Sequence, residues 1–234
     1  MEPQDFDSAV KAVATLKDPI RHKLYRLVGE RAHPVSRDEA AEAGGVPRSV
    51  AAFHLDRLAE AGLLDVEFRR LGDRQGPGAG RPSKLYRRPD RDFAVSLPER
   101  RYDLAGKLLA RAVRDAIDGG LSVAKAVERR AVEAGRLFGQ DVLRRARPPG
   151  RQREATAATI SDALSECGFE PRRDESDIVL GNCPFRALAE ENTELVCGMN
   201  LGFIRGLLAG LGSPAVEARL DPQPGMCCVR LSVA

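Results

Sequence analysis

Residues 47–62 read PRSVAAFHLDRLAEAG, and the neighbouring segments are best understood from this stretch. Ala51, Leu55 and Leu58 recur at helical spacing, so they predict one buried face of a helix, which Gly62 ends as a C-cap. The opposite face is predicted to point outward and carries Ser49, Ala52, Phe53, Asp56, Arg57 and Glu60. Such a run is ordinarily a solvated helix face, so its role depends on the segments around it.

Three further helices are predicted upstream. They span residues 7–16, 19–29 and about 37–44. Asp18 supplies an N-cap and Pro19 the first helical position of the second helix. Ser36 and Glu39 have the capping-box spacing that opens the third, and Gly44-Gly45 ends it. A tight turn therefore leads from the third helix into residues 47–62.

A basic β-hairpin is predicted downstream, with strands at residues 64–69 and 83–88 joined by the glycine- and proline-rich loop 71–82. Residues 68–91 contain eight arginine or lysine residues against two aspartates, a net charge of +6, whereas the whole chain carries only +3. Such a local excess of positive charge indicates a phosphate-binding surface. Short helices followed by a basic hairpin make the order of a winged helix-turn-helix domain.

This order favours DNA contact over a solvated face. Arg48 or Arg57 would pair with guanine edges, and Phe53 or Ala52 would contact a thymine methyl group in the major groove. In the hairpin, Arg81 between Gly80 and Pro82 would enter the minor groove, unless the loop is simply solvated. The candidate DNA-binding residues are Arg48, Ser49, Ala52, Phe53, His54, Arg57, Arg70, Arg81 and Lys84.

The first 90 residues also resemble a known family. Residues 16–21, LKDPIR, and 50–63, VAAFHLDRLAEAGL, are similar to the helix start and the recognition helix of the ArsR-like winged-helix transcriptional regulators. His54 and Leu55 match that recognition helix, whereas Ala52 stands where the family usually has a serine. The resemblance implies a winged helix-turn-helix DNA-binding domain over residues 1–92.

The rest of the chain is predicted to mix helices and strands. Helices at 98–117 and 123–145 would form a helical linker and dimerisation region, residues 93–150, whose interface would use Leu104 and Leu108. Residues 151–234 would form an α+β sensor domain with a helix ending at Cys167, strands at 169–173, 178–181, 216–220 and 227–233, and a helix at 193–211. The predicted fold class is α+β.

Five cysteines, two of them adjacent at Cys227 and Cys228, make a poor disulfide framework and a better set of reduced thiols. Their spacing is not that of a zinc finger. If residues 227–233 form a strand, Cys227 shares the apolar face and Cys228 the polar one, while Cys197 faces the core side of its helix. Cys167 has no partner at useful spacing and is assigned to packing.

The cysteine pattern is a Cys-Pro pair at Cys183, a helix-borne Cys197 and Cys227 near the end of the chain, all behind a winged helix. It resembles the SufR-type iron-sulfur repressors. The resemblance implies that Cys183, Cys197 and Cys227 hold an iron-sulfur cluster, with Cys228 as a possible further ligand. Two alternatives stay open. The site binds zinc, or the cysteines bind no metal and the C-terminal domain binds a small molecule.

Composition and motifs limit the function classes. With 43% hydrophobic and 30% charged residues among 234, the chain is predicted to be globular. An acidic N-terminus and the lack of an uninterrupted apolar run of about 20 residues predict a cytoplasmic protein with no membrane partner. No phosphate-binding glycine motif, G-x-S-x-G elbow or H-E-x-x-H helix is present, so no enzyme is predicted. The expected function is a homodimeric repressor that binds a double-stranded DNA operator.

Overall fold

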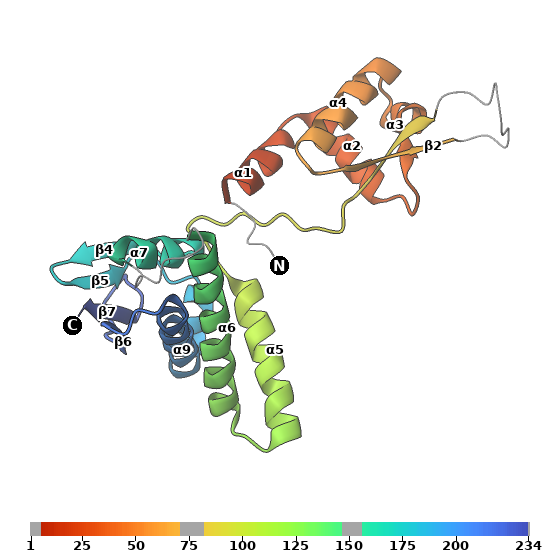
Figure 1. The fold of residues 1–234 in the computed structure, drawn as a ribbon. Coiled ribbons are helices and arrows are strands. Elements are labelled where there is room, and N and C mark those ends of the chain that lie inside the picture. The colour runs from red at the N-terminus through yellow and green to blue at the C-terminus, as the bar shows by residue number, and fades with distance from the viewer. Residues whose placement is uncertain (1–5, 71–81, 147–155, 234) are drawn as a thin grey trace. The chain divides into compact units, whose positions relative to one another are not determined.

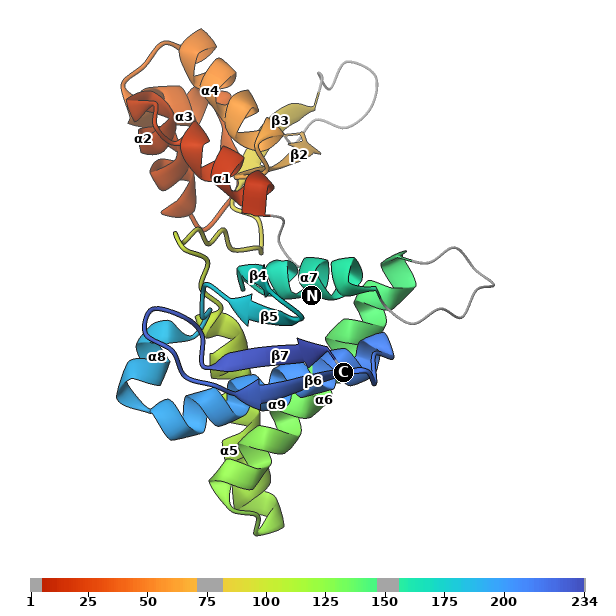
Figure 2. The same ribbon diagram turned by 90° about the vertical axis from the view of Figure 1, so that its left-hand side faces the viewer.

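The computed structural model describes residues 6–70, 82–146 and 156–233. It confirms a mixed α+β chain of helices and antiparallel strands, drawn in Figures 1 and 2. The chain divides into two compact units, Met1–Val95 and Ser96–Ala234. Each unit has its own hydrophobic core.

Among its described residues, the N-terminal unit contains four helices and three short strands. They are α1 (Phe6–Thr15), α2 (Pro19–Gly29), β1 (Val35–Ser36), α3 (Arg37–Gly44), α4 (Arg48–Glu60), β2 (Asp65–Arg69) and β3 (Ser83–Arg87). The strands form an antiparallel sheet in the order β1-β3-β2. The two predicted caps form, because Asp18 accepts a hydrogen bond from the Arg21 backbone and Ser36 accepts one from the Glu39 backbone. Strand β1 was not predicted, since two residues carry no periodicity.

The core of this unit lies between α2, α3, α4 and the sheet. Leu24, Leu55, Leu58 and Tyr86 are each almost completely buried. Gly45, with φ of 63°, makes the turn between α3 and α4 in the left-handed conformation that favours glycine. The predicted inward face of α4 is therefore confirmed, and its opposite face is directed away from the core.

The C-terminal unit contains five helices and four strands in the part of the chain that the structure describes. They are α5 (Tyr102–Gly119), α6 (Val123–Ala146), α7 (Ala157–Glu166), β4 (Pro171–Asp174), β5 (Asp177–Leu180), α8 (Arg186–Glu191), α9 (Thr193–Leu211), β6 (Val216–Leu220) and β7 (Val229–Val233). The strands form an antiparallel sheet in the order β4-β5-β7-β6. Helix α9 packs on β6 and β7 and on α6, and α6 packs on α5 (Figure 1).

Helices α6 and α9 touch backbone to backbone. A Cβ atom added at Gly135 of α6 would lie 1.9 Å from the carbonyl oxygen of Phe203, and one at Gly206 of α9 would lie 2.1 Å from that of Val132. Gly139 and Gly210 are equally close to the facing helix. The glycines recur at four-residue spacing on both helices, the pattern that lets helix axes approach most closely.

Helix α9 is long and apolar enough to cross a membrane by length and composition. However, 67% of its apolar window is buried inside the protein, where it forms the centre of the C-terminal core. This burial fits the core helix of a soluble protein, which passes the same test of length and composition.

Three features differ from the sequence prediction. Helices α5 and α6, predicted as a separate linker, belong to the same compact unit as the C-terminal strands because α6 packs along α9. Leu108, predicted in a dimer interface, is buried in this unit's own core, and Leu104 packs against it. Strand β7 begins at Val229 and not at Cys227, because its pairing with β6 ends at Leu220 opposite Val229.

Candidate functional site

The outward face of α4 is the first candidate site. Arg48, Ser49, Phe53 and Arg57 are exposed and Ala52 is partly exposed. Phe53 leaves 56% of its surface in solvent, and the Arg57 guanidinium lies 5.7 Å from the centre of its ring. Arg48 pairs with Asp38, and Arg57 pairs with Glu60. Exposed ion pairs of this kind are weak, so both arginines can exchange a carboxylate for another anion at little cost.

His54 does not belong to that face, which corrects its prediction as a DNA contact. It is only 8% exposed, and its Nδ1 lies 3.8 Å from an Asp18 carboxylate oxygen. Helical spacing explains the burial, since His54 is three residues after Ala51 and four before Leu58, which both face the core. The His54 side chain therefore lies on the buried side of α4, between the helix and the core.

Asp56 joins α4 to the sheet. Its carboxylate accepts hydrogen bonds from Lys84 and from the Tyr86 hydroxyl on β3, and from Arg37 at the start of α3. Burial acts to raise the pKa of Asp56, but the hydrogen bonds from Lys84 and Tyr86 outweigh it and lower the pKa. Lys84, predicted as a phosphate contact, thus has its charge engaged by Asp56. Its role is to hold α4 and the hairpin together.

The hairpin presents basic and apolar side chains. Arg70 is exposed just beyond β2, and Phe68 leaves 69% of its surface in solvent. Phe68 and Arg48 line one groove between the hairpin and the start of α4. Arg81 lies outside the described residues. Within the described part, Arg48 at the start of α4 and the exposed end of the hairpin therefore border a common groove.

The cysteines form the second candidate site. Cys183 lies in the turn after β5, Cys197 on α9, and Cys227 and Cys228 just before β7. Cys183 and Cys227 each influence the pKa of the other, and Cys228 influences that of Cys197, so these thiols lie near one another. The fold thus brings together the three predicted ligands and Cys228. All five cysteines are free, and Cys228 alone among them is not fully buried.

The prediction that Cys227 and Cys228 lie on opposite faces required both residues to be part of the last strand, and the structure does not meet this condition. The alternation that separates neighbouring side chains applies to a paired strand, and β7 begins only at Val229. Cys227 and Cys228 precede that strand, so both thiols can interact with the same group of cysteines. The sequence pattern does not indicate that the strand begins after Cys228.

The surroundings of Cys183, Cys197 and Cys227 raise the pKa of each of these three thiols. The hydrogen bond with Cys227, followed by burial, raises the pKa of Cys183 well above its usual value. At Cys227 the hydrogen bond with Cys183 lowers the pKa, but Cys228 and burial outweigh it and raise the pKa to about 11. Across the described residues, no three histidine, cysteine or carboxylate side chains stand in a formed metal-ligand arrangement. Binding of a metal would therefore release protons and change the spacing of the thiols.

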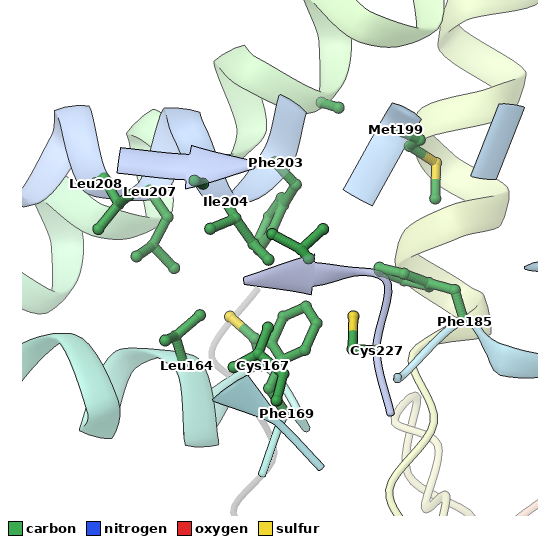
Figure 3. Close-up of a cluster of buried hydrophobic side chains, with 14 of the residues drawn as sticks. Leu164, Cys167, Phe169, Phe185, Met199, Phe203, Ile204, Leu207, Leu208 and Cys227 are labelled. Atoms are coloured by element: carbon green, nitrogen blue, oxygen red, sulfur yellow. The ribbon is translucent and has the colours of Figure 1, made fainter. Parts of the chain in front are cut away.

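Cys167 behaves as the sequence predicts. It is buried beside Leu164 and Phe169 in the C-terminal core, as Figure 3 shows, and burial raises its pKa strongly. Cys227 belongs to the same cluster of buried side chains (Figure 3). Cys167 has no thiol partner among the other cysteines, so its role is packing.

A hydrogen-bonded clamp, which sequence reasoning missed, holds the turn that carries Cys183. The Asn182 amide donates to the carbonyls of Glu99 and Gly168 and accepts from Arg100, which also donates to the Cys183 carbonyl. The Arg101 backbone donates to the Pro184 carbonyl. The turn is therefore fixed to residues 99–101, which open the C-terminal unit.

The two sites differ in chemistry. The α4 face and hairpin offer arginines and exposed aromatic rings to a large anionic partner, whereas the four cysteines offer soft sulfur donors to a metal. Comparison with protein-family models, curated proteins and solved structures finds no match to this chain.

Proposed function

We propose that this protein is a DNA-binding transcriptional regulator whose N-terminal unit is a winged helix-turn-helix module. The observation that carries the proposal is the exposed face of α4, which follows the Gly45 turn and precedes the basic hairpin. An α-helix fits the width of the major groove, where Arg57 would read guanine and Phe53 a thymine methyl. The Asp56 contacts support this role because they keep α4 and the hairpin in one rigid arrangement.

The DNA proposal predicts two kinds of loss. Arg57→Ala and Phe53→Ala should weaken binding to the preferred sequence by about 10- to 100-fold and relax the choice of bases. Arg81→Ala should weaken operator binding and reduce its salt dependence, because the guanidinium would enter the negative potential of the minor groove. The measurement is a titration, at several salt concentrations, of sites that the wild-type chain selects from a random DNA library.

Arg26→Ala is the matched control for Arg57→Ala. Arg26 is also an exposed helical arginine paired with a glutamate one turn away, but it lies on α2. It should leave affinity within about twofold of wild type, since exposed pairs contribute little. If Arg57→Ala and Arg26→Ala bound the selected sites equally well, α4 would not be the reading helix.

The proposal includes a second copy of the chain, because one recognition helix covers only half of a two-fold symmetric site. Helix α5 carries an exposed apolar stripe for such a contact. Its exposed side includes Tyr102, Gly106, Ala110, Val113 and Ile117, which recur at helical spacing. This stripe replaces Leu104 and Leu108 as the proposed dimer surface, since Leu108 is buried within the unit.

Ile117→Asp is expected to convert a dimer into a monomer. The change places a charge in the C-terminal part of the proposed apolar contact, where it would lose its hydration. Sedimentation at micromolar concentration measures the result, and Leu220→Asp, at an exposed apolar residue of β6, should leave the dimer intact. A wild-type monomer, with or without DNA, would remove the second copy from the proposal.

We further propose that the cysteines hold a metal centre, an iron-sulfur cluster in the first place and zinc in the second. Cys183, Cys197 and Cys227 would be the ligands, and Cys228 is the fourth thiol within reach. Four thiols and no carboxylate suit soft metal ions, which supports this assignment. An iron-sulfur cluster would supply sensitivity to oxidants, iron and sulfide.

The clamp at Cys183 offers a route from this site toward the N-terminal unit. The turn is bonded to residues 99–101, while Arg91 donates to the Gly62 carbonyl and Phe93 packs on the N-terminal core. Residues 94–98 join these two anchored stretches. The Cys183 turn is therefore bonded to residues next to the segment that joins the two units.

A further inference from the structure

Asn200 is an unexpected residue at its position. It lies on α9 three residues after Cys197 and is only 1% exposed, in a helix whose buried residues are otherwise mostly apolar, such as Met199, Phe203 and Ile204. Its side-chain amide nitrogen donates a hydrogen bond of 3.2 Å to the sulfur of Cys227. Its side-chain oxygen is buried without a hydrogen-bond partner.

An asparagine in this place weakens the core. A buried amide oxygen without a partner carries the full cost of its lost hydration, and a leucine of similar volume would carry none. The single hydrogen bond that the amide makes does little to offset this, because the sulfur of a neutral thiol is a weak acceptor. Residues that break the packing rules of a core in this way are expected at functional sites.

The same hydrogen bond becomes stronger if the acceptor is charged. A thiolate accepts a hydrogen bond far better than a thiol does, since charge-assisted hydrogen bonds are roughly twice as strong as neutral ones. Metal ligation requires that thiolate. The Asn200 amide is therefore matched to the ligating form of Cys227 and not to the metal-free form.

We propose that Asn200 is a positioning residue of the cysteine site, which stabilises the Cys227 thiolate and holds its sulfur toward Cys183 and Cys228. The inference rests on the proposed metal centre and adds the residue that tunes it. Hydrogen bonds to ligating sulfurs are one of the factors that set the reduction potential of iron-sulfur clusters. Because this bond stabilises negative charge on sulfur, it favours the more electron-rich, reduced state of the centre.

Asn200→Leu tests the proposal because the stability of the metal-free chain should not fall, whereas its retention of metal should. The metal-free variant should be at least as stable to urea as wild type, because leucine removes the buried amide oxygen that has no hydrogen-bond partner. After anaerobic reconstitution with ferrous iron and sulfide, the same variant should lose its metal to a chelator at about 10- to 100-fold lower chelator concentration. Its reduction potential should be more negative than that of wild type.

Ser213→Ala is the matched control. Ser213 is also buried with an unpartnered oxygen, but it lies beyond the far end of α9. It should gain stability as Asn200→Leu does and keep wild-type metal retention and potential. If the bound metal is zinc, the two variants are compared by the zinc content that each retains.

Three other results would contradict the proposed role of Asn200. Wild-type retention and potential in Asn200→Leu would overturn the role of Asn200 while leaving the metal centre in place. A metal-free Asn200→Leu chain that is less stable than wild type would also overturn it, because the amide would then be an ordinary structural group. A wild-type chain that takes up neither iron and sulfide nor zinc would overturn both this inference and the proposed metal centre.

Discussion

Gly206→Ala is expected to destabilise the C-terminal unit by about 3 kcal/mol or more, a large share of the roughly 5–15 kcal/mol that holds a typical domain folded. The added Cβ atom would lie 2.1 Å from the carbonyl oxygen of Val132, and 2.8 Å from the carbonyl carbon. The obstacle is helix backbone, which cannot rotate away as a side chain can. Helix α9 would have to move off α6 and toward the sheet, where β6 and β7 already pack against it.

Gly198→Ala on the same helix is the control. A Cβ atom there meets nothing within 4 Å, so alanine should stabilise the unit by up to about 1 kcal/mol through its better helix propensity. Urea unfolding followed by circular dichroism measures both variants. Equal stability of Gly206→Ala and Gly198→Ala would mean that the backbones of α6 and α9 are not in direct contact.

Cys183→Ser and Cys227→Ser are each expected to abolish metal retention. Serine oxygen is a poor replacement for a thiolate at iron, and both residues belong to the group of interacting thiols. Cys197→Ser should have the same effect. The measurement is visible absorption with iron and sulfide content after anaerobic reconstitution, or zinc content for the alternative metal.

Cys167→Ser is the control for this series, since Cys167 is buried in the same core without a thiol partner, and it should keep the metal. Cys228→Ser is the informative variant. Strand alternation predicts that it keeps most of the metal, whereas the influence of Cys228 on the pKa of Cys197 leads us to expect a loss as large as that of Cys227→Ser. If all four single variants at Cys183, Cys197, Cys227 and Cys228 kept their metal in full, these cysteines would be packing residues and not metal ligands.

Local chemistry was sufficient for much of the secondary structure. The predicted bounds of α2, α9 and β6 agree with the structure, because an N-cap, a proline, an apolar period or a terminal glycine acts within a few residues of itself. The face of α4 that bears Phe53 and Arg57 followed from the same kind of evidence. The roles of these residues in DNA binding stay predictions.

Tertiary contacts decided which side chains are buried and which residues they contact. His54 is buried because Asp18 and the core surround its side of α4, and strand alternation does not separate Cys227 from Cys228 because β7 begins only at Val229. The glycines of α6 and α9, and the amide of Asn200 against Cys227, acquire meaning only when segments distant in sequence meet. Periodicity along the chain reports which side chains share a face, but the neighbour that covers the face comes from elsewhere in the chain, and no local pattern encodes it.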